Sequence, residues 1–82
     1  MTDEALLSQV IYPIIFDKYP IKAMVRVTTL LKRDLSAEER VRLSDLLQSK
    51  TFDANHPLVN LHNPICDKKE LELYLEALAR EL

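Results

Sequence analysis

Apolar residues recur at three- and four-residue intervals along four segments of the chain, which is the period of an amphipathic α-helix. The first segment is expected to form a helix from about Asp3 to Tyr12. Thr2 suits its N-cap, and the ring of Pro13 clashes with the preceding helical turn. Resumption of the helix through Phe16 stays open. The apolar positions of this segment are Leu6, Leu7, Val10, Ile11 and Ile14.

The second segment predicts a helix from Pro20 to about Arg33, because proline fits the first position of a helix. Its apolar face comprises Ala23, Met24, Val27, Leu30 and Leu31. On the other side, four polar residues fall within about 60° of one another at 100° per residue. We call them the basic strip: Lys22, Arg26, Thr29 and Arg33.

Two capping boxes, in which a polar side chain and a glutamate three residues later satisfy end donors of the helix, mark the remaining two helices. Ser36 and Glu39 begin a helix that should end near Lys50, and Asp67 and Glu70 begin the last one. The apolar residues of these helices are Val41, Leu43, Leu46 and Leu47, and then Leu71, Tyr74, Leu75, Leu78 and Leu82. The sequence therefore predicts an all-α fold, a compact bundle of four main helices.

The stretch FDANHPLVNLHNPICD, residues 52–67, connects the last two predicted helices and has no strong periodicity. A structureless connection of this length is uncommon between helices. Pro57 favours a short helical turn before the last helix, capped by His56 or Asn55 and ended by Pro64. The residues expected to point inward are Leu58, Val59 and Leu61. We interpret the stretch first as a pinned connector, second as a contact surface and last as a metal site.

Composition restricts the classes of protein further. The chain of 82 residues has no glycine, although about 7% is usual. Phosphate-binding loops need glycine for close backbone approach, and tight hairpins strongly favour it. The familiar nucleotide enzymes and hairpin-rich β folds are therefore disfavoured. The length indicates a single domain, residues 1–82, with a small core, to which a partner or a second copy of the chain would add stability.

A single cysteine rules out an internal disulfide bond, and the longest apolar run is far shorter than the roughly 20 residues that cross a bilayer. The chain also starts with acidic residues, where a secretory signal carries basic ones. We expect a cytoplasmic protein that has no membrane partner.

Residues with metal-binding or nucleophilic chemistry gather in the connector, but their spacing matches no common zinc motif. They are Asp53, His56, His62, Cys66 and Asp67. Cys66 precedes a helix start, where a thiol pKa can fall, yet nucleophilic catalysis also needs an oriented base. Neighbouring glutamates at helix starts are explained by capping. We expect no enzyme, no metal and no cofactor.

Charge is distributed unevenly about a net charge of −2. Residues 18–50 carry eight bases against four acids, whereas residues 1–17 and 51–82 are each acidic by three charges. Either the basic middle pairs with the acidic ends inside the bundle, or it forms a basic binding face.

These observations predict a non-catalytic protein–protein interaction module that acts as a small regulator, adaptor or inhibitor. Its expected contact residues are those of the basic strip, namely Lys22, Arg26, Thr29 and Arg33, together with His56 and His62 of the connector. Self-association is an alternative, since Ile21, Val25 and Leu73 lie outside the main apolar stripes. The second hypothesis is a nucleic-acid-binding domain that uses the basic face of the second helix, although the net negative charge counts against it.

Overall fold

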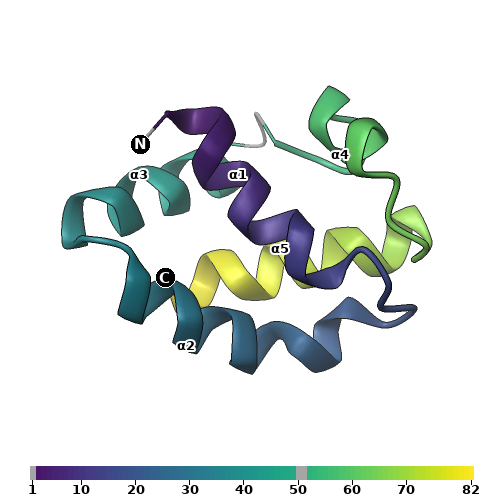
Figure 1. The fold of residues 1–82 in the computed structure, drawn as a ribbon, viewed down its shortest axis with the longest axis horizontal. Helices are drawn as coiled ribbons and strands as arrows, with labels where there is room; N and C mark the ends of the chain where they lie inside the picture. The colour runs from purple at the N-terminus through teal and green to yellow at the C-terminus, as the bar shows by residue number, and fades with distance from the viewer. Residues whose placement is uncertain (1, 50–51) are drawn as a thin grey trace.

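The computed structural model describes residues 2–49 and 52–82, and within these ranges the fold is all-α. Its elements are α1 (Asp3–Ile11), the 3₁₀ turns η1 (Tyr12–Ile14) and η2 (Pro20–Ala23), α2 (Met24–Asp34), α3 (Ala37–Gln48), α4 (Pro57–His62) and α5 (Lys68–Glu81). α5 lies near the centre, between α1 and α2, and α4 lies at the upper right, where it packs against α1 (Figure 1). The predicted bundle of four main helices, with a short helical segment before the last one, is confirmed.

The core forms around the apolar stripe of α5, as the helical period predicts. Its side chains Leu71, Tyr74, Leu75 and Leu78 are all buried. Tyr74 also ties the last helix to the first, because its hydroxyl donates a hydrogen bond of 2.8 Å to the carbonyl of Val10. Burial raises the pKa of the Tyr74 phenol far above its usual value.

Two of the three N-caps predicted for the main helices are made. The hydroxyl of Thr2 accepts a hydrogen bond from the Ala5 amide, and Ser36 and Glu39 form the full capping box at the start of α3. The box predicted at Asp67 is wrong. Asp67 has the extended backbone of an N-cap residue, but its side chain accepts no capping hydrogen bond. It is exposed, so water can serve the first amides of α5 instead.

Both early prolines change the helix type rather than only its limits. Pro13 ends α1 at Ile11 and the chain continues as η1, in agreement with the expected break. The helix predicted from Pro20 is different at its start, since residues 20–23 form a 3₁₀ turn and α2 begins at Met24. Short 3₁₀ turns are frequent at helix N-termini. The predicted end of the third helix near Lys50 lies outside the described residues.

The connector is a pinned, partly buried segment, as predicted. Phe52 and Ala54 are buried beside the bundle, and the amide of Ile65 donates a 3.0 Å hydrogen bond to the carbonyl of Ile15. α4 ends at His62, and its C-cap Asn63 adopts the left-handed conformation with φ of 50°. The inward orientation expected for Leu61 is wrong, because its side chain is 75% exposed. Val59 is buried, and a residue two positions away points about 200° around the helix.

Two arginines from the basic middle of the chain pair with acids of its N-terminal part. Arg42, from the basic middle of the chain, forms a two-point ion pair with Asp3 at 2.7 and 3.0 Å. Arg26 approaches Asp17, with 3.8 Å between their nearest atoms. In the described ranges, no helix combines the length and apolar character that crossing a bilayer requires.

Candidate functional site

A cleft of about 580 Å³ lies between α3, the connector and α5, and we call it the α3–α5 cleft. Its floor is apolar and belongs to the core, with Leu47, Phe52, Leu75 and Ala79 each at most 8% exposed. A volume of this size lies within the range of clefts that hold small ligands or single side chains of a partner.

The spacing of residues on α5 explains why one helix supplies both floor and rim. Glu72, Leu75, Glu76 and Ala79 follow at intervals of three and four residues, so that they line one side of the helix. Leu75 and Ala79 pack toward the core, and the two glutamates stand at the margin. The cleft thus combines a dry base with carboxylates at its edge.

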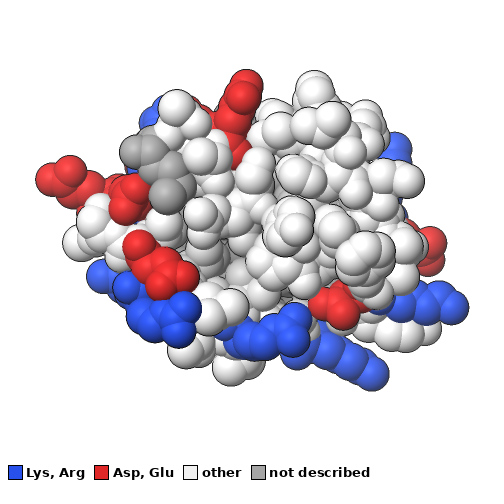
Figure 2. Space-filling view, viewed as in Figure 1, with Lys and Arg blue, Asp and Glu red and all other residues white. Residues whose placement is uncertain are grey.

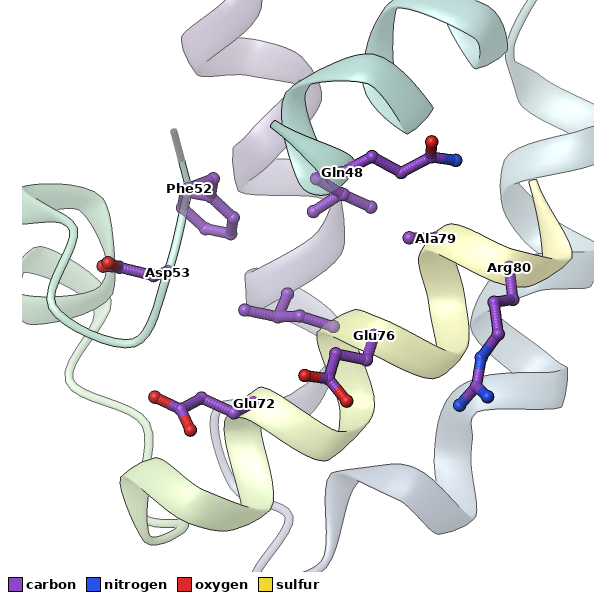
Figure 3. Close-up of a pocket in the computed structure, with 9 residues that line it drawn as sticks. Gln48, Phe52, Asp53, Glu72, Glu76, Ala79 and Arg80 are labelled. Atoms are coloured by element: carbon purple, nitrogen blue, oxygen red, sulfur yellow. The ribbon is translucent and has the colours of Figure 1, made fainter. Parts of the chain in front are cut away.

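The charges of the rim are unevenly placed. Glu72 and Glu76 point toward the connector, where Asp53 lies, and Arg80 follows on α5 at the far end of the cleft (Figure 3). In the described part of the chain, no hydrogen bond or ion pair engages Glu72 or Glu76. The carboxylates of Glu72 and Glu76 can therefore accept hydrogen bonds from cationic groups of a ligand. The Asp53 carboxylate is turned outward in Figure 3 and accepts a 2.9 Å hydrogen bond from the Asn55 amide.

Sequence reasoning missed this cleft. The alternation of glutamates with Leu75 and Ala79 is visible in the sequence, but it also describes an ordinary solvent-exposed helix margin. The cleft exists because Phe52 lies beside α5, where the edge of one ring meets the other between Phe52 and His56, with 4.9 Å between the ring centres. That arrangement depends on long-range packing, for which the sequence has no local signal.

The basic strip lies on another part of the molecule, along η2 and α2 at the lower edge of Figure 1. Several of its polar groups already have partners nearby. Arg33 binds the carboxylate of Asp34 through two nitrogens, at 2.9 and 3.4 Å, and the Thr29 hydroxyl donates to the carbonyl of Val25. The hydrogen bond between Arg33 and Asp34 raises the pKa of the arginine and lowers that of the aspartate.

The first half of the strip borders a second, shallower pocket of about 350 Å³. Lys22 and Arg26 line it together with Asp17, Lys18 and Tyr19. The ammonium of Lys22 lies 5.4 Å from the centre of the Tyr19 ring, within the range of a cation–π contact. Arg26 is held beside Asp17, so that one acid partly offsets the three cations of this pocket.

The two predicted histidines serve α4 itself and lie apart from the basic strip (Figure 1). His56 is the N-cap of α4, and its Nδ1 accepts a 3.1 Å hydrogen bond from the amide of Leu58. His62 ends the helix and meets the ring of Tyr12 edge to face, with 6.3 Å between ring centres. The structure thus brings Lys22 and Arg26 together but does not join them to His56 or His62.

Cys66 does not have the environment of a reactive thiol. Burial raises its pKa, and the nearby acids Asp67, Glu70 and Asp17 raise it further, which is opposite to the lowering that a helix start can cause. Across residues 2–49 and 52–82, no three residues among histidine, cysteine, aspartate and glutamate are grouped closely enough to hold a metal ion.

Comparison of the chain with protein-family models, with curated proteins and with solved structures finds no match. The geometry of the cleft and of the basic strip is therefore the basis for assigning a function.

Proposed function

We propose that this chain is a non-catalytic protein-interaction module, a small regulator, adaptor or inhibitor, whose α3–α5 cleft holds an apolar and basic helical segment of a partner protein. The observation that carries the proposal is the combination of a buried apolar floor with the carboxylates of Glu72 and Glu76 on the rim. An amphipathic helix that binds in a groove needs these two features, since its apolar side chains enter the groove and its charges meet the rim.

Charge determines which kind of partner fits. Among the described residues, the lining of the cleft includes Asp53, Glu72 and Glu76 against one base, Arg80, at its far end. Lysine or arginine residues beside the apolar anchors of the partner would meet these carboxylates, and acidic residues would be repelled. The proposal therefore favours a basic amphipathic helix over an acidic one.

The basic strip offers a competing contact surface for the same function. It has charge but lacks a comparable apolar base, and Arg33 and Arg26 are already close to acids of the chain itself. For the same reason we rank nucleic-acid binding second, because a phosphate would compete with these internal partners for the arginines.

A peptide titration tests the proposal. A helical peptide of leucine and lysine residues, and a counterpart with glutamate in place of lysine, would be added to the isotopically labelled protein and followed by amide chemical shifts. We expect the lysine peptide to shift the amides of residues lining the cleft, Gln48, Asp53, Glu76 and Ala79 among them. The glutamate peptide should bind at least tenfold more weakly, a difference of about 1.4 kcal/mol.

Matched variants separate the two surfaces. Replacing Glu72 and Glu76 with lysine should weaken the lysine peptide at least about tenfold. Replacing the exposed Glu38 and Glu81 with lysine changes the net charge equally and should have a much smaller effect. Replacement of Lys22 and Arg26 with glutamate should leave this binding intact. The proposal is wrong if the shifts map to α2, or if both peptides bind equally well.

A further inference from the structure

Two stretches without any charged residue lie side by side on the surface. Residues 5–16 and residues 54–66 contain no aspartate, glutamate, lysine or arginine. The first forms most of α1 and all of η1, the second includes α4, and α1 packs against α4. Figure 2 shows a broad area free of charged side chains over this part of the molecule, with acids and bases at its margins. We call the surface of these two stretches the uncharged face.

Four large apolar side chains are exposed on this face, and internal contacts bring their segments together. They are Tyr12, Phe16, Leu61 and Ile65, with 67, 82, 75 and 59% of their surface exposed. The ring contact between Tyr12 and His62 and the hydrogen bond from the Ile65 amide to the Ile15 carbonyl hold the two stretches in register. These side chains are not part of the core, to which α1 and α4 contribute other residues.

We propose that the uncharged face is the contact of a symmetric homodimer. In a twofold contact the same surface meets itself, so any charge close to the axis faces a charge of the same sign. The basic strip and the carboxylates of the α3–α5 cleft would each repel their own copy in such a contact. The uncharged face has no such repulsion. The same face of a second copy can therefore pack against it without bringing like charges together.

The exposed apolar area of the uncharged face limits the size of the contact. At about 150–250 Å² for a whole aromatic side chain, Tyr12 and Phe16 together expose roughly 220–370 Å² in each copy. With Leu61 and Ile65 added, two copies approach the low end of specific interfaces, at about 1,200 Å² in total. Since contacts of this size are weak, the dimer should form only at high protein concentration.

Sedimentation of the full chain from about 1 µM to about 1 mM tests the proposal, because weak complexes form over this range. We expect the mass to rise from 9.5 kDa toward twice that value. Phe16→Glu and Leu61→Glu should each keep the chain monomeric at every concentration. Circular dichroism would confirm that both variants stay folded, as expected for exposed positions.

Two further substitutions provide the matched control. Val25 and Val41 are 69 and 62% exposed, outside the uncharged face, and each is next to arginine in the sequence. Val25→Glu and Val41→Glu introduce the same charge and should dimerise like the original chain. A chain that stays monomeric throughout, or four variants that behave alike, would overturn the proposal.

Salt distinguishes this dimer from a head-to-tail association in which the basic strip enters the cleft of a second copy. An uncharged contact should persist as sodium chloride is raised, because it contains no ion pairs to screen. Association that disappears at high salt would contradict the symmetric contact. Phe16→Glu should also leave peptide binding in the α3–α5 cleft unchanged, so that the two proposals can fail separately.

Discussion

The α3–α5 cleft and the basic strip are both charged surfaces beside a helix, yet they differ in what lies beneath the charges. Under the carboxylates of the cleft is a floor of buried leucine, phenylalanine and alanine side chains. The strip runs along an exposed helix side, and Arg33 and Arg26 lie close to acids of the same chain. A row of like charges in a sequence therefore does not by itself identify a binding site, because affinity also needs apolar area that a partner can cover.

The largest expected effect is a difference in the free energy of unfolding between a substitution in the cleft and one beside the basic strip. Phe52 is a buried part of the cleft floor, so Phe52→Ala should lower the free energy of unfolding by about 3–5 kcal/mol. Val25 is exposed beside the basic strip, and Val25→Ala should change it by no more than about 0.5 kcal/mol. Urea unfolding monitored by circular dichroism measures both. Equal effects would mean that the floor of the cleft is not part of the core.

A second substitution loosens α5 on the side away from the cleft. Tyr74→Phe removes the hydrogen bond to the Val10 carbonyl and should cost about 1–3 kcal/mol. Peptide binding in the cleft should be unchanged, provided that the assay is run under folding conditions. A loss of binding would show that the cleft depends on how α1 docks rather than on its own lining.

Tyr74 also gives the stability of the original chain a pH dependence that Tyr74→Phe lacks. Burial raises the pKa of Tyr74 above its unfolded value of about 10, so the neutral phenol is favoured in the folded state. The resulting stability is complete below about pH 10 and is lost as the pH rises above the unfolded pKa. Unfolding at pH 9 and pH 11 should therefore show a larger loss for the original chain than for Tyr74→Phe.

The smallest expected effect concerns the starts of the two helices that form the cleft. Ser36→Ala removes one hydrogen bond of the capping box of α3 and should cost about 1 kcal/mol. Asp67→Ala should cost less, because the Asp67 side chain makes no capping hydrogen bond in α5. Denaturant midpoints of the two variants give the comparison directly. An equal or larger loss for Asp67→Ala would show that charge at the helix start outweighs the hydrogen bond.

The helices were predictable because their signals are local. The apolar period of α5 and the capping box at Ser36 each lie within one or two helical turns of sequence, and both are confirmed. Leu61 was assigned to the wrong side because a six-residue helix is too short for its apolar face to be read from periodicity. The box at Asp67 failed for a related reason, since the residue pattern does not fix where an exposed carboxylate points.

The candidate surfaces were much less predictable. The alignment of Lys22 with Arg26 was visible on a helical projection, but the approach of Asp17 to Arg26 was not. The α3–α5 cleft and the uncharged face both form where segments far apart in sequence meet, such as Phe52 with α5 and Tyr12 with His62. Their assembly is a property of the packed bundle, which helical period and capping motifs do not encode.

The left-handed C-cap of α4 is an asparagine because the chain contains no glycine, and that absence also affects the unfolded chain. Helices often end on glycine, but this chain has none and uses Asn63. A chain of this length with average composition would contain about six glycines. At about 0.4–1 kcal/mol of backbone entropy for each compatible position, their absence is worth roughly 2–6 kcal/mol. For a protein with so small a core, part of the stability thus comes from the lower backbone entropy of its unfolded chain.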